Sequence, residues 1–268
     1  MKPSTSLRLV LLALAVLLPR TSVAQSLFDG RWRIDPVEDQ LSAKPRVFLL
    51  KDGAYRCASC TPAFDIKADG SDQKIAGEPC YDTVAITIVD ASSIVETDRR
   101  NGKTVGGSRK IVSPDGNTLT DEWTESCDAE GNVITGKQIF TRIKDAPPGA
   151  HAVSGSWQVS RPAELSENAL VGTFKLDAST FSLSDPTGQS YIANLDGTET
   201  PIKGDLSNTI VSVRLIDANT VEETDKRDGK IVQVVRYSVA HDGKSMSITF
   251  TDKVRGTTVQ STAHKLGL

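Results

Sequence analysis

The sequence predicts an all-β protein built from two copies of one unit. The stretch Asp90–Val105 returns as Asp217–Val232 with nine of sixteen positions identical, and self-similarity at a long spacing indicates a repeated structural unit. Apolar and polar residues alternate in Thr209–Ile216, which is typical of a half-buried strand. Turn-forming dipeptides such as Asn101-Gly102 and Asp228-Gly229 separate the strand-like segments. No convincing helical period is present after the first residues.

Each unit is expected to end in an antiparallel meander of five strands, preceded by shorter strands. Closure of such strands into an up-and-down barrel removes the exposed sheet edges. Gly30-Arg31-Trp32 opens the first unit and Gly155-Ser156-Trp157 opens the second. The predicted organisation is therefore a signal peptide (1–24), a first barrel (25–143), a linker containing proline and glycine (144–152) and a second barrel (153–268).

The N-terminus predicts export. Lys2 and Arg8 form a basic start, and Leu9–Leu18 is an apolar run too short to span a bilayer as a helix. Ser22-Val23-Ala24 then offers the small-x-small pattern of a signal peptidase site. We expect a mature chain that begins near Gln25, lies in the periplasm or outside the cell, and has no membrane span.

The charge excludes nucleic acid as an expected partner. The chain has a formal charge of −3, and removal of the signal takes away three basic residues and no acid, which leaves −6. Binding of nucleic acid requires a concentrated basic face, and no cluster of Lys and Arg interleaved with aromatic residues occurs.

All four cysteines lie in the first unit and predict two disulfides, since an even count is typical of exported proteins. One lies just before the first meander strand and another just after the fourth, at the same end of the barrel. This favours Cys80–Cys127 and leaves Cys57–Cys60. Three other roles of the cysteines lack a required feature. A thioredoxin-like redox motif needs a helix start, and haem attachment needs His at the position of Thr61. A four-cysteine zinc site needs a second Cys-x-x-Cys pair.

The Gly-x-Trp openings and the meanders resemble the lipocalin-like barrels, and the second repeat resembles a domain of exported bacterial proteins. The resemblance implies that Trp32 and Trp157 close one end of each barrel, with a basic residue of the last strand packed on the ring. Arg142 suits this basic role in the first unit, and His264 or Lys265 falls there in the second. It also implies a cup for a small apolar molecule.

One polar pattern recurs in both units: two acids followed by an arginine. If the strands pair outward from the Asn101-Gly102 turn, Ile94 lies opposite Arg109. The acids and the arginine then share one face of the sheet, which we interpret as the inner face. The second unit is less clear, because Val235, Tyr237 and Val239 make its other face apolar as well. The cluster lines a cup and orients a ligand, or forms a partly solvated ion pair at the rim. Its members are Glu96, Asp98, Arg109, Glu223, Asp225 and Arg236.

The sequence favours a binding protein over an enzyme. Its three histidines have no metal-ligand spacing, and Gly-x-Ser-x-Gly and phosphate-binding glycine loops do not occur. We therefore expect no catalytic residue, no metal and no cofactor. The predicted function is binding of a small apolar or amphipathic molecule by an exported protein. The alternative is a protein-interaction or inhibitor module, because small barrels can be filled by their own side chains.

Overall fold

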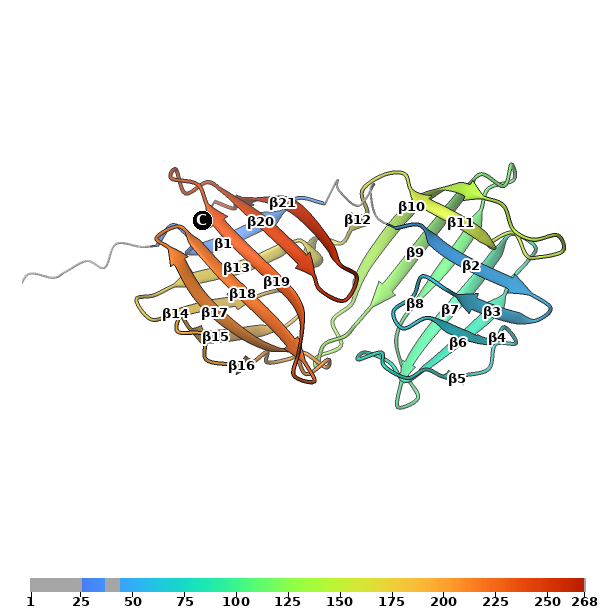
Figure 1. The fold of residues 1–268 in the computed structure, drawn as a ribbon, viewed down its shortest axis with the longest axis horizontal. Coiled ribbons are helices and arrows are strands. Elements are labelled where there is room, and N and C mark those ends of the chain that lie inside the picture. Colours follow the sequence, from blue (N-terminus) through green and yellow to red (C-terminus); the bar gives the residue numbers. More distant parts are fainter. Residues whose placement is uncertain (1–25, 37–43, 268) are drawn as a thin grey trace, which may run out of the picture.

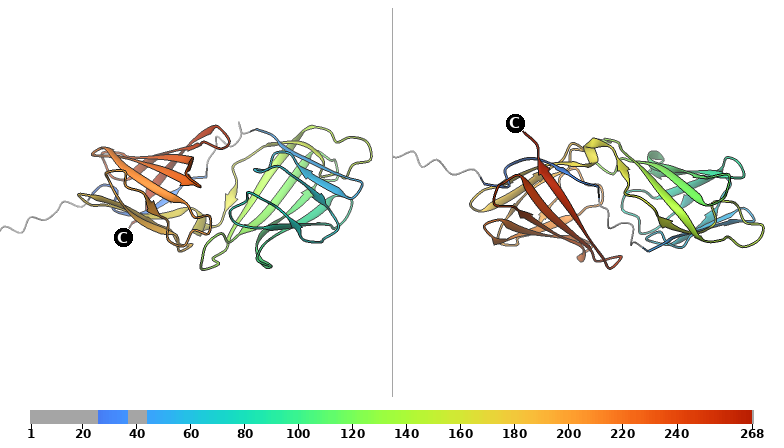
Figure 2. Two further views of the ribbon diagram at one scale, coloured as in Figure 1. Left: turned by 60° about the horizontal axis from the view of Figure 1, so that its bottom comes forward. Right: turned by 90° about the horizontal axis from the view of Figure 1, so that it is seen from above.

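The structure is a computed structural model that describes residues 26–36 and 44–267, and the predicted signal peptide lies outside them. The described chain forms two antiparallel, barrel-like sheets, which confirms the predicted fold class. Figures 1 and 2 show the two barrels side by side along the long axis of the molecule. None of the helices in the described residues has the length and apolarity that a membrane crossing requires.

The first sheet, barrel I, contains eleven strands in the order β4-β3-β2-β11-β10-β9-β8-β7-β6-β5, with β12 paired to β10. Its consecutive strands from β6 to β11 are all neighbours, as expected for a meander. The strands are β2 (Arg46–Lys51), β3 (Ala54–Cys57), β4 (Phe64–Lys67), β5 (Gln73–Lys74), β6 (Thr83–Ile88), β7 (Ser93–Arg100), β8 (Lys103–Val112), β9 (Thr118–Glu125), β10 (Ile134–Lys144), β11 (Gly155–Val159) and β12 (Glu164–Leu165).

The second sheet, barrel II, contains ten strands in the order β15-β14-β13-β1-β21-β20-β19-β18-β17-β16. A short 3-10 helix, η2 (Glu167–Ala169), lies just before its strand β13. The strands are β1 (Gly30–Ile34), β13 (Val171–Leu176), β14 (Thr180–Ser184), β15 (Ser190–Asn194), β16 (Thr200–Pro201), β17 (Ile210–Asp217), β18 (Thr220–Arg227), β19 (Lys230–Val239), β20 (Ser245–Asp252) and β21 (Thr257–Lys265).

The two sequence units exchange their first strands. β1, at the start of the first unit, pairs with β13 and β21 in barrel II. β11, at the start of the second unit, pairs with β10 and β2 in barrel I. The predicted linker, residues 144–152, therefore lies between two paired strands of one sheet. Since β11 follows β10 closely along the chain, pairing with it costs little loop-closure entropy, and β1 fills the equivalent slot in barrel II.

The exchange changes which basic residue packs on which tryptophan. In barrel I the Arg142 guanidinium lies 4.0 Å from the ring centre of Trp157 and donates hydrogen bonds to the carbonyls of Ser154 and Ala152, at 2.6 and 2.7 Å. The expectation that Arg142 packs on Trp32, the tryptophan of its own sequence unit, is thus wrong, because Arg142 packs on Trp157. Both tryptophan side chains are fully buried.

Lys265, rather than His264, takes the basic position in barrel II. Its ammonium lies 4.9 Å from the ring centre of Trp32 and donates to the carbonyl of Leu27 at 2.8 Å. The paired positions are equivalent, because Trp32 pairs with Lys265 just as Trp157 pairs with Arg142. Gly155 is required at its position, since its φ is +127° and a Cβ there would lie 2.6 Å from a backbone oxygen.

Both predicted disulfides are present. Cys57–Cys60 closes the turn after β3, and Cys80–Cys127 joins the segment before β6 to the start of the β9–β10 loop. The Cα atoms are 5.4 Å apart in each bridge, within the usual range. No free cysteine occurs among the described residues.

Fragments test the exchange. Residues 44–166 contain every strand of barrel I, so we expect this fragment to fold alone and to unfold cooperatively on heating. Residues 167–268 contain the strands of barrel II except β1 and also lack β11, which leaves unpaired strand edges. We expect this second fragment to remain unfolded or aggregated until a peptide of residues 26–36 is added. Circular dichroism measures both outcomes, and independent folding of 167–268 without the peptide would contradict the exchange.

Candidate functional site

The strands that carry the repeated acids are offset by one residue from the predicted register. Ile94 pairs with Lys110 rather than with Arg109, and Asp98 pairs with Gly106. The pairing shifts between Asp98 and Arg99, as in a β-bulge, and the same shift occurs between Asp225 and Lys226. Because side chains alternate with a period of two, a slip of one residue moves a whole strand face to the other side. The predicted face was therefore wrong for β8 and β19.

The arginines lie on the outer faces of the barrels. Arg109 is exposed, and Arg236 forms an outer-face ion pair with Glu222 at 2.6 Å. The expected ion pair between Glu96 and Arg109 does not form. The predicted cluster of two acids and an arginine is thus not brought together in either barrel. The four acids, Glu96, Asp98, Glu223 and Asp225, do lie on the inner faces.

In barrel I the acids surround a buried lysine. The Lys110 side chain is only 6% exposed, and its ammonium lies 3.1 Å from Glu96 and 3.6 Å from Asp121. Burial, with the nearby Glu96 carboxylate, raises the pKa of Asp98 to about 7 against the opposing effect of Lys110. Buried oxygens of Asp98, Asp121 and Tyr55 have no hydrogen-bond partner. The interior of barrel I is therefore polar around Lys110, with more acids than bases, and apolar in the rest of its core.

In barrel II two tyrosines replace the lysine. The Glu223 carboxylate accepts hydrogen bonds from the hydroxyls of Tyr191 and Tyr237, the latter at 3.2 Å. Gln233 donates to Asp225 at 3.4 Å. Burial raises the pKa of Glu223, and burial together with Glu223 raises that of Asp225 to about 9. The pair therefore holds at least one proton at neutral pH, which avoids two unpaired buried charges.

The strand registers align the two interiors position by position. Lys110 of barrel I corresponds to Tyr237 of barrel II, and each lies opposite the residue two positions before the Glu-x-Asp pair. The next strand places Asp121 opposite Lys110 and Ile248 opposite Tyr237. Barrel II keeps the acid pair but surrounds it with apolar and aromatic groups. Tyr237 and Ile248 thus give barrel II apolar surface at the positions where barrel I has Lys110 and Asp121.

A cavity of about 260 Å³ lies at the junction, where the open end of barrel II meets barrel I. Its apolar wall comes from barrel II, and its polar side comes from the end of β9, the β9–β10 loop and the β14–β15 loop. Apolar surface with a few placed polar groups is typical of small-molecule sites. The apolar wall includes Ile34, Val171, Phe174, Leu183, Tyr237 and Phe250.

The β9–β10 loop forms a fixed roof over this cavity. The Cys80–Cys127 disulfide anchors its start. Ala129 donates its backbone N–H to the Gly204 carbonyl at 2.8 Å, and the Asn132 amide donates to the Thr187 carbonyl at 2.6 Å. Figure 1 shows this loop between the two barrels. The cavity is thus assembled from both sheets and was not visible in either sequence unit alone.

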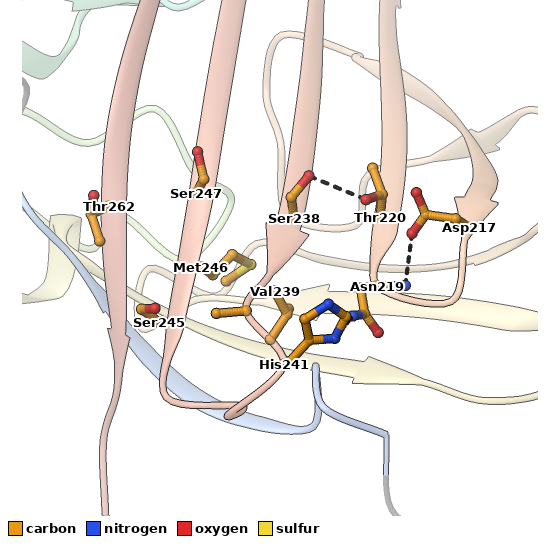
Figure 3. A pocket seen from close by; sticks show the side chains of 11 residues that line it. Asp217, Asn219, Thr220, Ser238, Val239, His241, Ser245, Met246, Ser247 and Thr262 are labelled. Atoms are coloured by element: carbon orange, nitrogen blue, oxygen red, sulfur yellow. Dashed lines mark hydrogen bonds between the residues drawn. The ribbon is translucent and has the colours of Figure 1, made fainter.

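A second, larger depression of about 620 Å³ lies on the outer face of barrel II (Figure 3). Hydroxyls of four adjacent strands form a row there, Thr220, Ser238, Ser247 and Thr262. The first two lie 3.3 Å apart, and the Asn219 amide lies 3.1 Å from the His241 ring. These groups partly satisfy one another, and polar side chains on an outer strand face are ordinary. We therefore place the candidate site at the junction.

One group in the described residues has metal-ligand spacing. The ligand atoms of Cys80, Cys127 and Glu125 lie within 4.8 Å of one another. Both sulfur atoms belong to a disulfide, however, and a thiolate is the form that binds metal. Because the group consists mainly of this bridge, it does not support a metal site in the oxidised protein.

No protein-family model and no curated protein matches the chain. The functional argument therefore depends on the residues of the chain itself. Sequence reasoning found the acids, the tryptophans and the disulfides. It missed Lys110, Asp121, Tyr191 and the junction cavity, and the alternation of Val235, Tyr237 and Val239 was the signal for the correct inner face of β19.

Stability should fall as the pH rises, because of the Asp225 carboxyl. Its folded-state pKa is raised, so the native state keeps a proton that the unfolded state releases between about pH 4 and pH 9. We expect Asp225→Asn to flatten this decline and to be more stable than the wild type by about 1 kcal/mol or more at pH 8. Urea denaturation across this range measures the effect. Asp228→Asn, at an exposed turn, is the control, and an unchanged slope in Asp225→Asn would contradict the assignment.

The two disulfides should contribute unequally. On the chain-entropy model, the sequence separation of 47 residues makes Cys80–Cys127 worth about 4 kcal/mol, and the separation of three makes Cys57–Cys60 worth about 2 kcal/mol. We expect the Cys80→Ser/Cys127→Ser variant to lose more stability and to expose the β9–β10 loop to hydrogen exchange. The Cys57→Ser/Cys60→Ser variant is the matched control, and equal exchange in this loop would contradict its anchoring role.

Proposed function

We propose that the protein is an exported, non-enzymatic, lipocalin-like protein that binds a small apolar or amphipathic molecule. The site proposed is the cavity at the junction of the barrels. The observation that carries the proposal is the combination of an apolar wall from barrel II with a polar roof from barrel I around about 260 Å³ of space. The ligand would place its apolar part against Phe174 and Phe250 and its polar part under the roof.

Two further observations support the lipocalin-like character. Each barrel closes one end with a buried Gly-x-Trp tryptophan, and a cation from the paired strand lies on its ring. These are the features that the sequence resemblance leads us to expect. The order of strands is that of an up-and-down barrel, apart from the exchange of β1 and β11. The similarity is one of architecture, so the ligand is argued from the cavity itself.

Export is proposed from the disulfides and from the predicted signal peptide. Two bridges consume all four cysteines, and structural disulfides persist mainly in oxidising compartments. The expected location is the periplasm or the surroundings of the cell. A protein-binding or inhibitor function is the second candidate, because aromatic packing fills part of barrel II. Phe174 and Phe181 lie 5.3 and 5.9 Å from Tyr237, ring centre to ring centre.

Titration with the neutral probe 2-phenylethanol tests the proposed function. We expect wild-type protein to bind it with a millimolar or tighter Kd, which corresponds to about −4 kcal/mol. Leu183→Trp should abolish binding, since the larger side chain fills the cavity. Ile192→Trp, on a neighbouring strand but 70% exposed, should bind normally. Isothermal titration calorimetry measures the affinities, and circular dichroism checks the fold of each variant.

Native mass spectrometry of the protein from its own host separates the two candidates. A small bound mass that is lost on denaturation is expected for a binding protein. A bare mass, together with no binding of the phenyl probe, would contradict the proposed function and favour the interaction module.

A further inference from the structure

The junction cavity has an uneven charge. Three of its lining residues are acids, Glu125, Asp128 and Asp185, and no lysine, arginine or histidine lines it. The Glu125 side chain is exposed, so a neutral ligand that covers its carboxylate would remove it from water without a compensating charge, which is unfavourable. The polar partners of the three acids therefore decide which chemistry the cavity prefers.

The carboxylates of two of these acids already accept hydrogen bonds from residues of their own loops. The Asp128 carboxylate accepts the backbone N–H groups of Glu130 and Asn132, at 2.8 and 3.2 Å. Asp185 accepts the backbone N–H of Thr187 at 2.8 Å and the hydroxyl of the same residue. Such hydrogen bonds satisfy a carboxylate within its own turn. These two side chains thus shape the roof and the neighbouring loop.

Glu125 differs, because its carboxylate has no hydrogen bond and no ion pair with any described residue. It is the last residue of β9 in barrel I, and its side chain lines the junction cavity. On the inner face of barrel I it shares a row with Gly106 and Asp98. Gly106 has no side chain to separate the two acids, and a Cβ there would lie 3.5 Å from the Asp98 carboxylate.

Asp98 also has a buried oxygen without a hydrogen-bond partner, although Asp98 itself does not line the cavity. Three basic side chains of the two barrels have partners of their own. Arg255 forms an ion pair with Asp252 at 2.9 Å, Arg227 donates to the Thr209 hydroxyl at 3.0 Å, and Lys110 lies between Glu96 and Asp121. The junction therefore joins an aromatic wall on the side of barrel II to the Glu125 carboxyl group, which has no basic partner, on the side of barrel I.

We propose that the junction cavity binds a small amphipathic organic cation, with its ammonium group at Glu125 and its apolar part against Phe174, Tyr237 and Phe250. This inference rests on the proposed function and specifies the ligand class. An ammonium group suits the site because it donates several hydrogen bonds to carboxylates and can face aromatic rings. Both sulfur atoms near Glu125 are held in a disulfide, which makes a metal ion the poorer occupant.

Three probes of similar shape and different charge test the inference. They are 2-phenylethylamine, 2-phenylethanol and 3-phenylpropionate, which are cationic, neutral and anionic at neutral pH. A hydrogen bond to a charged group contributes enough free energy for a preference of about tenfold. We expect wild-type protein to bind the amine at least tenfold more tightly than the alcohol, and the propionate most weakly. The preference should decrease in high salt, which screens charges.

The matched variants are Glu125→Gln and Glu122→Gln. Glu125→Gln should lose about tenfold in affinity for the amine and keep its affinity for the alcohol. Glu122 lies on the same strand but on the outer face, 3.2 Å from Lys137, so its variant should behave as the wild type. If Glu125→Gln does not fold, the wild-type ratio of amine to alcohol and its salt dependence still decide the question.

The outcomes separate this inference from the proposed function. Equal binding of amine and alcohol by the wild type would overturn the cation preference and leave the binding function standing. Amine selectivity that survives in Glu125→Gln would overturn the role of Glu125. If none of the three probes binds to the wild type, the proposed function fails, and the ligand class fails with it.

Discussion

Closure of each barrel by a Gly-x-Trp strand is the constraint on which the rest of the structure depends. The strand fills the gap beside the last meander strand, buries its tryptophan and receives a basic side chain on the ring. Either copy of this strand fits either gap, because both copies share the glycine and the tryptophan. The local connection assigns β11 to barrel I, so β1 must cross to barrel II. Along the chain, barrel II therefore supplies one strand before the first strand of barrel I and nine strands after its last strand, so the chain connects the two barrels twice.

The repeated Glu-x-Asp pair occupies equivalent inner positions but meets different neighbours. In barrel I the lysine and a third acid keep the interior charged. In barrel II two tyrosine hydroxyls and a shared proton take their place, which allows apolar walls. The same pair of acids is therefore compatible with charged neighbours in one barrel and with apolar neighbours in the other. The difference between Lys110 and Tyr237 accounts for much of this contrast.

The junction combines these two interiors. Barrel II offers aromatic surface at its open end, and barrel I offers acids and the anchored β9–β10 loop. The disulfide that anchors the loop occurs only in the first unit, which is the unit that supplies the roof. The cysteines and the unpaired Glu125 thus lie on the same side of the cavity. This asymmetry between otherwise similar units is the main structural argument for a binding site at the junction.

The sequence by itself determined the β class, the repeat and the tryptophan positions, because repeats, alternation and turn residues are local signals. It favoured the disulfide pairing that the structure shows. Only the tertiary structure decided the exchange of β1 and β11, since both strands carry the same motif and chain connectivity selects between them. It also decided the inner face of β8 and β19. A bulge after Asp98 and after Asp225 shifts the pairing by one residue, which exposes Arg109 and Arg236 and buries Lys110 and Tyr237. The cavity, finally, needs residues from both sheets, and no pattern within one unit could reveal it.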